Sequence, residues 1–219
     1  MNSRSEMADP HMLKSISLPR RTLLGCLAAG LVATPRLALA QSATDQAMTF
    51  VQKAGQDLVG VVNGPGSSTA KTAAMQAIID RTVDVTSVGR FCLGRFWRTA
   101  TPEQQKDYLE LFHHALVLNI TSKVGEYQGV TISFSHAAAR EDGVAVNSIV
   151  NRPNQAPSKV DWLVSTESGA PRIVDVIAEG TSLRLTQRND YAAYMSRNGN
   201  SVPALIEALK KQAVTPAAG

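Results

Sequence analysis

The sequence predicts an α+β fold in which helices pack on a strongly twisted antiparallel sheet of about four strands. Three observations support this fold class. Within residues 45–123, apolar residues recur at intervals of three and four, as in amphipathic helices. Within residues 130–178 they alternate with polar residues, as in half-buried strands, and helical periodicity returns within residues 190–211. We therefore expect the sheet and its helices to enclose a deep apolar cavity.

Four helices are expected before the strands. The first covers residues 45–62 and stops at the sequence Asn-Gly-Pro-Gly of residues 63–66, because glycine and proline disfavour a continued helix. Ser67 or Ser68 can cap the second helix, and the third covers residues 85–97.

The best-marked helix start lies at Thr101. Its hydroxyl can accept a hydrogen bond from the first helical turn, and Pro102 suits the first helical position. Gln104 can return the bond and complete a capping box. We therefore expect a long fourth helix over residues 102–123.

The strands are separated by sequences that favour turns. Residues 181–185 extend or follow the last strand. Two short helices, over residues 190–197 and 202–211, are then expected to close the chain. The turn sequences are Asp142-Gly143, Pro153-Asn154 and Ser168-Gly169.

Residues 1–40 have the features of a signal peptide preceded by a short N-terminal extension. An apolar run covers residues 23–33, and Ala-Leu-Ala at residues 38–40 forms a cleavage signal. Arg20 and Arg21 partly match a twin-arginine signal. Export to the periplasm by the general secretory route or by the twin-arginine route is therefore expected.

The remaining chain is predicted to form one domain over residues 41–214, followed by a disordered tail over residues 215–219. From Gln41 onwards, 17 Lys and Arg stand against 16 Asp and Glu. This near balance argues against nucleic acid as a partner. Cys92 is the only cysteine in that part, so the domain has no intramolecular disulfide and must be held together by its core.

No arrangement of residues predicts catalysis or a metal site. His113 and His114 are neighbours on a helix and point about 100° apart, so they cannot bind one metal ion together. We expect them to be a solvated or capping pair. Cys92 lies between Phe91 and Leu93 and is expected to pack in the core.

Asp175 interrupts an otherwise apolar strand over residues 173–178. Two interpretations are open. In a conical apolar pocket, the carboxylate would suit a general base of a small-molecule enzyme. Otherwise it lies at the rim of the sheet and pairs with an arginine such as Arg98 or Arg188.

Several separated motifs together resemble the MlaC / toluene-tolerance family, whose members are periplasmic carriers of phospholipid. The resemblance extends over residues 45–209. Val83, Thr181 and Tyr191 depart from the family pattern, which leaves the identity of the lipid more open than the fold. The matching residues are Asp84, Gly94, Trp97, Arg98, Thr101, Pro102, Glu103 and Gln104, and then Asp175, Val176, Glu179, Gly180, Ser182, Leu183 and Arg188.

The resemblance implies a soluble, monomeric periplasmic carrier that holds phospholipid acyl chains in an apolar cavity, without a cofactor. It also implies exchange of lipid with an inner-membrane ABC transporter complex that has an MCE subunit, and with an outer-membrane lipoprotein complex. Related members accompany hopanoid biosynthesis, so a hopanoid or another polycyclic lipid is an alternative cargo. Alternatives from other classes are a small-molecule enzyme with a conical pocket, as in NTF2-like folds, and a structural or protein-binding module.

Helical faces and strand alternation predict the side chains that would line the cavity. Such a cavity must present no unpaired polar group to an acyl chain. The same alternation also predicts an ordinary solid core, so the sequence does not distinguish the two. The predicted lining residues are Phe96, Phe112, Leu116, Ile132, Phe134, Val146, Val164, Val176 and Leu183.

Overall fold

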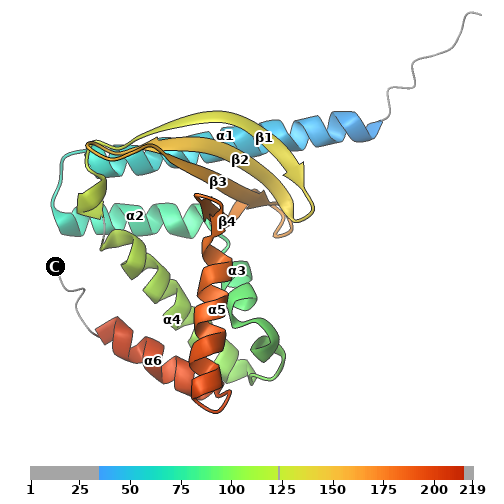
Figure 1. The fold of residues 1–219 in the computed structure, drawn as a ribbon, viewed down its shortest axis with the longest axis vertical. Helices are drawn as coiled ribbons and strands as arrows, with labels where there is room; N and C mark the ends of the chain where they lie inside the picture. Colours follow the sequence, from blue (N-terminus) through green and yellow to red (C-terminus); the bar gives the residue numbers. More distant parts are fainter. Residues whose placement is uncertain (1–34, 123, 215–219) are drawn as a thin grey trace, which may run out of the picture. The chain divides into compact units, whose positions relative to one another are not determined.

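The computed structural model describes residues 35–122 and 124–214, and in this part the chain follows the predicted order of helices, sheet and helices (Figure 1). Short 3₁₀ turns, η1 and η2, follow α3 and α4. The helical elements are α1 Pro35–Asn63, α2 Ser68–Thr82, α3 Val85–Leu93, η1 Gly94–Arg98, α4 Pro102–Thr121, η2 Val124–Tyr127, α5 Leu183–Arg197 and α6 Val202–Val214. The strands are β1 Thr131–Arg140, β2 Gly143–Asn151, β3 Ser158–Ser165, β4 Arg172–Ala178 and β5 Thr181–Ser182.

The strands form one antiparallel sheet in the order β1-β2-β3-β4-β5, so each strand pairs with its neighbour in the chain. This confirms the predicted fold class, and the predicted extension of the last strand forms the two-residue strand β5. The turn between β1 and β2 requires glycine. At Gly143, where φ is +143°, a Cβ atom would lie 2.2 Å from the carbonyl oxygen of Val164.

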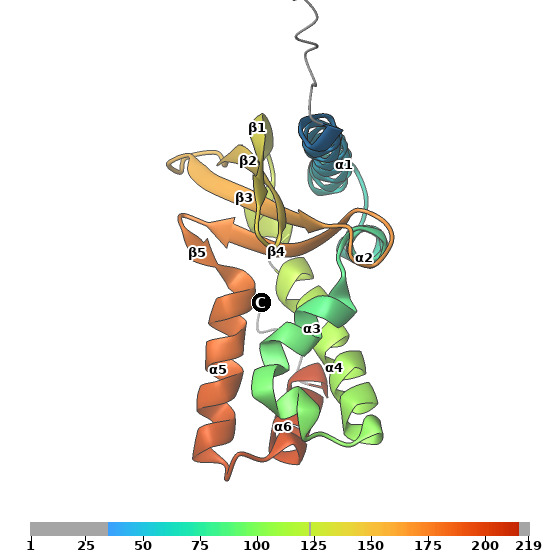
Figure 2. The ribbon, with the colours of Figure 1, turned by 90° about the vertical axis from the view of Figure 1, so that its right-hand side faces the viewer.

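Helix α1 packs against one face of the sheet, over β1 and β2 (Figure 2). Gly55 permits this close approach, because a Cβ atom there would lie 2.7 Å from Cζ of Phe134. We call the buried group that joins this helix to the sheet the strand core. It consists of Ala47, Val51, Val146 and Val164.

Helices α3 to α6 pack on one another below the sheet in Figure 2. Tyr108 lies at the centre of this group, fully buried, and its hydroxyl donates a hydrogen bond to the carbonyl oxygen of Gly89 at 2.9 Å. Its ring contacts those of Phe112 and Tyr191. We call the buried residues of these helices the helical core: Cys92, Leu93, Phe96, Ala100, Tyr108, Phe112, Ala115, Tyr191, Met195, Val202, Leu205, Ile206 and Leu209.

A third cluster, the junction core, joins α1, α2 and α4 to the start of the sheet. The side chain of Asn63 fixes this joint: its Nδ2 donates to the carbonyl oxygen of Val130 at 3.0 Å, and its Oδ1 accepts from the Gly129 amide at 2.7 Å. The chain entering β1 is thereby tied to the end of α1. The buried members of the junction core are Val62, Met75, Ile79, Val117 and Val130.

The helix starts read from the sequence are confirmed at α2 and α4. The Ser67 hydroxyl accepts from the Ala70 amide, and Thr101 and Gln104 form the predicted capping box. Both starts combine a capping side chain with a preceding turn, which makes them local signals that a sequence carries well.

Three predicted helix boundaries are wrong: the end of α3 and the starts of α5 and α1. Helix α3 ends at Leu93 rather than Trp97, because Gly94 has φ +58° and ψ −129°, outside the helical region. Helix α5 begins at Leu183 rather than at residue 190, because the Ser182 hydroxyl caps it. Helix α1 begins at Pro35, ten residues before the predicted start.

The predicted signal peptide falls largely on residues 1–34, which lie outside the described residues, as does the predicted tail over 215–219. Residues 35–40, also assigned to the signal peptide, are the first residues of α1. Both assignments stay predictions. Among the helices of residues 35–122 and 124–214, none combines the length and the apolar character that crossing a bilayer requires.

Two glycines of α1 test its contact with the sheet. We expect Gly55→Ala to destabilise the fold by about 1–3 kcal/mol, since the new methyl group would collide with Phe134. Gly60→Ala is the matched control, because a Cβ atom there meets nothing within 4 Å. It should stabilise the helix by about 0.5–1 kcal/mol. Urea unfolding measures both changes, and equal stabilisation by the two variants would contradict the observed packing.

Candidate functional site

Five of the nine predicted lining residues lie on one face of the sheet. Directly paired residues of neighbouring strands share a face, and Val146 pairs with Trp162, which pairs with Val176. Phe134 begins a second row, which continues through Ser148 of β2. The five residues are Ile132, Phe134, Val146, Val164 and Val176.

Helix α1 covers part of this apolar face. Val146 is fully buried and Val164 is 2% exposed, and both belong to the strand core with Ala47 and Val51. Val176, on the same face near the other edge of the sheet, is only half-buried. The face is therefore closed under α1 and less tightly covered towards β4.

The other four predicted residues lie elsewhere. Phe96 and Phe112 belong to the helical core, and Leu183 is 51% exposed at the start of α5. Leu116 on α4 packs against both the helical core and the junction core. On the same helix, Ile120 is 39% exposed.

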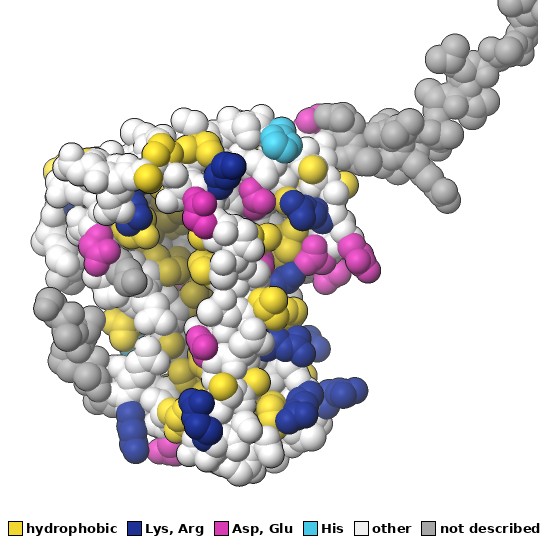
Figure 3. Space-filling view, viewed as in Figure 1, with side chains coloured by type: hydrophobic (Ala, Val, Ile, Leu, Met, Phe, Trp, Pro, Cys, Tyr) yellow, Lys and Arg dark blue, Asp and Glu magenta, His cyan; other side chains and the backbone are white. Residues whose placement is uncertain are grey.

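A hollow with hydrophobic side chains at its bottom lies below the sheet, between the places where Figure 1 draws α4 and α5 (Figure 3). Five surface pockets on the described residues have volumes of about 170 to 810 Å³. Among the predicted residues, Val164 lines one of these five. The nine residues thus do not share one of these pockets, and the single deep cavity stays a prediction.

The polar groups on the apolar strand face bond to one another. Trp162 donates from Nε1 to the Ser148 hydroxyl at 2.9 Å, and that hydroxyl donates to the carbonyl oxygen of Val160 at 2.9 Å. Within residues 42–122 and 124–213, no buried side-chain nitrogen or oxygen lacks a partner. An apolar ligand could therefore lie against this face without separating a buried polar pair.

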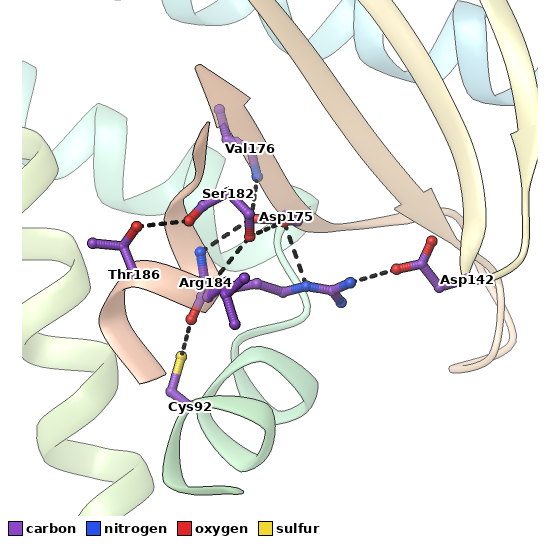
Figure 4. Close-up of polar contacts among 8 residues, drawn as sticks. Cys92, Asp142, Asp175, Val176, Ser182, Arg184 and Thr186 are labelled. Carbon is purple, nitrogen blue, oxygen red and sulfur yellow. Dashed lines mark hydrogen bonds and ion pairs between the residues drawn. The ribbon is translucent and has the colours of Figure 1, made fainter. Parts of the chain in front are cut away.

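Asp175 lies on the opposite face of β4, because its partner Leu163 is next to Trp162 in β3. Its carboxylate is 3% exposed and is surrounded by donors (Figure 4). The Ser182 hydroxyl donates to it at 2.6 Å, the Val176 amide at 2.8 Å and the Arg184 amide at 3.1 Å.

The arginine that pairs with Asp175 is Arg184, with Nε 3.4 Å from Oδ2. The predicted partners Arg98 and Arg188 and the predicted rim position are therefore wrong. Arg184 also forms an ion pair with Asp142 in the turn between β1 and β2. Helix α5 starts immediately after β5, and this places its second residue beside β4.

This geometry gives Asp175 a structural role, because its contacts hold the start of α5 against β4. Both carboxylate oxygens accept hydrogen bonds from the protein, and the side chain is closed off from solvent. A general base needs an oxygen within reach of a substrate proton. The structure therefore favours the structural interpretation of Asp175 over the catalytic one.

The remaining candidate residues have ordinary structural contacts. His113 Nε2 lies 2.6 Å from Oδ1 of Asp80, whereas His114 is exposed. Cys92 is buried, and its Sγ donates to the carbonyl oxygen of Arg184 at 3.5 Å. Within the described ranges, no group of three or more His, Cys, Asp or Glu side chains is placed to hold a metal ion.

The key contacts that sequence reasoning missed are those of Ser182 and Arg184. Ser182 caps α5 and bonds to Asp175 with the same hydroxyl. A serine directly before the first apolar residue of a helix is a capping signal. Leu183 and Leu185 continue the apolar alternation past Gly180, and this pattern favours a strand over the helix that Ser182 caps.

Comparison of the sequence with protein families gives a match over most of the described residues. Residues 52–211 match the family described as MlaC protein. The chain belongs to the MlaC family. This confirms the family resemblance drawn from the motifs around Gly94 and Asp175.

Two individual proteins resemble this MlaC-family chain. A toluene tolerance protein, ttg2D of Pseudomonas putida, is 28% identical over 139 residues, which are 61% of this chain and 63% of that protein. A solved phospholipid-binding protein from Ralstonia solanacearum, in complex with a phospholipid, has a TM-score of 0.69 and 24% identity. That match covers 79% of this chain and 99% of the solved one, and it shows that the two share a fold.

The Asp175 contacts predict a large loss of stability in Asp175→Asn. We expect about 2–4 kcal/mol, because the buried donors lose a charged acceptor. Asp142→Asn is the matched control: it removes the other partner of Arg184, but Asp142 is about half exposed. That change should cost less than about 1 kcal/mol. Chemical denaturation of both variants measures the difference, and similar losses would show that Asp175 is not the dominant partner.

Cys92 should be unreactive in the folded protein. Burial, with the charge of Asp175, raises the pKa of its thiol to about 12, so the reactive thiolate is scarce at neutral pH. In a chain that begins at Gln41, a disulfide reagent such as Ellman's should modify no thiol at pH 8 until denaturant is added. Rapid modification without denaturant would contradict the described packing of α3 against α5.

Proposed function

We propose that this protein is a periplasmic carrier that binds the acyl chains of phospholipid against the apolar face of its sheet. The observation that carries the proposal is membership of the MlaC family. The apolar face of the sheet, on which five predicted lining residues lie, is consistent with it. The shared fold with a phospholipid-binding protein supports it.

The energetics of acyl chains explain why such a carrier needs a dry interior. A diacyl lipid has roughly 30 methylene groups, and exposing them to water costs about 20 kcal/mol. The face that carries Val146 and Val176 can replace water as their surroundings, since its polar atoms are already paired. The carrier then needs neither catalysis nor a cofactor.

The proposed acyl-chain site lies between β4, α4 and the tightly packed strand core. Val176 on β4 and Leu116 on α4 are each half-buried, whereas Val146 and Val164 are closed under α1. We propose that chains enter beside Val176 and Leu116 and extend towards Ile132 and Phe134. Loading by this route requires α1 to shift from the sheet.

The proposed transport path includes two membrane partners. The carrier would exchange lipid with an inner-membrane ABC transporter complex through its MCE subunit, and with an outer-membrane lipoprotein complex. Energy would then be supplied by the transporter, because the carrier holds its cargo without a covalent bond.

The first test is native mass spectrometry of the mature protein purified from its bacterial host. We expect one or more phospholipid molecules bound to each chain, and denaturing extraction should release the same lipid. A polycyclic lipid in the extract would replace phospholipid as the cargo. A protein free of lipid above background would contradict the carrier function.

A second test compares two tryptophan substitutions in one row of the sheet. Val176→Trp should reduce the number of bound lipids with little change in melting temperature, because the indole ring would occupy acyl-chain space. Val146→Trp, in the same row, should lower the melting temperature by overpacking the strand core. Lipid content and thermal stability are measured together on both variants. If Val176→Trp destabilises the fold without reducing lipid content, Val176 belongs to the solid core instead.

A further inference from the structure

Four arginines surround a surface pocket formed by α3, η1 and α5. The pocket has a volume of about 440 Å³, and its lining combines these arginines with two half-buried aromatic residues and Gly94. Basic side chains gather in Figure 3 to the right of the place where Figure 1 draws α5. We call this feature the arginine pocket, and its arginines are Arg90, Arg95, Arg98 and Arg188.

The four guanidinium groups are not neutralised by the protein. Within residues 42–122 and 124–213, none of them forms an ion pair with a carboxylate. The neighbouring Arg184 differs, because Asp142 and Asp175 both neutralise it. The pocket therefore concentrates positive charge in a domain whose total charge is close to zero.

Aromatic rings hold three of these arginines in place. Cζ of Arg90 lies 5.2 Å from the centroid of the Trp97 ring, and Cζ of Arg188 lies 5.0 Å from the centroid of the Phe91 ring. Arg95 lies over Phe96 in the same way. Such stacking reduces the entropy that an arginine loses when it binds a ligand.

Gly94 leaves room for the guanidinium of Arg188. At φ +58°, a Cβ atom on this residue would lie 3.1 Å from Nε and 3.3 Å from Cζ of Arg188. A side chain here would push the guanidinium away from the backbone. The pocket thus depends on a glycine at a position that only glycine adopts readily.

We infer that the arginine pocket binds the phosphate group of an anionic phospholipid headgroup, one that carries no cation of its own, at a membrane surface. Planar guanidinium groups bind phosphate with paired hydrogen bonds. Several guanidinium groups around one pocket can donate hydrogen bonds to different oxygens of the same phosphate. The inference rests on the proposed carrier function, since it assigns a surface by which the carrier would approach membranes.

Exposed leucines in the first turn of α5 favour a membrane over a free phosphate ion. Leu185 is 48% exposed and lies one helical turn from Arg188 on α5. Leu183, the first residue of that helix, is 51% exposed. Cations that flank exposed apolar side chains are typical of surfaces that contact anionic bilayers. A free ion would gain nothing from the leucines.

Vesicle sedimentation tests the inference with the mature protein. The vesicles contain equal amounts of phosphatidylethanolamine and phosphatidylglycerol, and vesicles of phosphatidylcholine alone serve as the neutral comparison. We expect binding to the anionic vesicles that decreases with salt, and a loss of about tenfold or more in affinity for the double variant Arg95→Gln/Arg98→Gln.

The double variant Arg152→Gln/Lys159→Gln is the matched control. It also removes two positive charges, but from the region of β3 and the turn before it, and Arg152 too is stacked on an aromatic ring, that of Tyr127. Its affinity for the anionic vesicles should change less than about twofold. Equal losses in the two double variants would overturn the inference, because general charge would then explain the binding.

Two further measurements separate the alternatives. If titration shows that inorganic phosphate binds through Arg95 and Arg98 while vesicles do not bind, the site is for free phosphate and the inference is wrong. No binding of either probe would also overturn it, and an acidic protein would become the better candidate partner. Native mass spectrometry of Arg95→Gln/Arg98→Gln should still show bound lipid, so failure at this surface is distinguishable from failure of the carrier function.

Discussion

The buried carboxylate of Asp175 connects elements that are far apart in the sequence. It accepts hydrogen bonds from the backbone of β4, from the serine that caps α5 and from the first turn of α5, and it pairs with Arg184 (Figure 4). Arg184 extends the connection to the turn between β1 and β2 through Asp142, and to α3 through the Cys92 thiol. A buried charge is tolerable here because every side of it meets a donor.

The alternation of the strands keeps this polar network apart from the apolar face. Leu163, opposite Asp175, and Trp162, opposite Val176, are neighbours in β3, so their partners point to opposite sides of the sheet. Asp161 and Asn147 bond to each other on the side of Asp175. One side of the sheet thus provides the polar connection to the helices, and the other provides an apolar surface on which the polar groups of Ser148 and Trp162 bond to each other.

Local signals in the sequence predicted local structure well. The capping box at Thr101, the glycine turn at Gly143 and the period-two alternation all act within a few residues, and the structure contains each of them. Alternation also brought Val146 and Val176 to one face. It misplaced Leu183, because the apolar pattern continues past Gly180 although the Ser182 hydroxyl has already started a helix.

The sequence pattern did not predict which residues from distant segments contact one another. The choice of Arg184 over Arg188 as the partner of Asp175 depends on how sharply β5 turns into α5. Whether Val146 faces a cavity or a core depends on how closely α1 approaches the sheet, and alternation alone carries no such information.

Phe91 shows how one side chain serves both the fold and the surface. The centroid of its ring lies 4.5 Å from Cζ of Arg184 and 5.0 Å from Cζ of Arg188. The first arginine is neutralised by two carboxylates and holds α5 to the sheet, whereas the second lies at the arginine pocket without one. Because both rest on the same ring, the network that fixes α5 also fixes the position of the unpaired charge. The protein can therefore present a charged outer surface in a defined place while its apolar strand face stays free of charge.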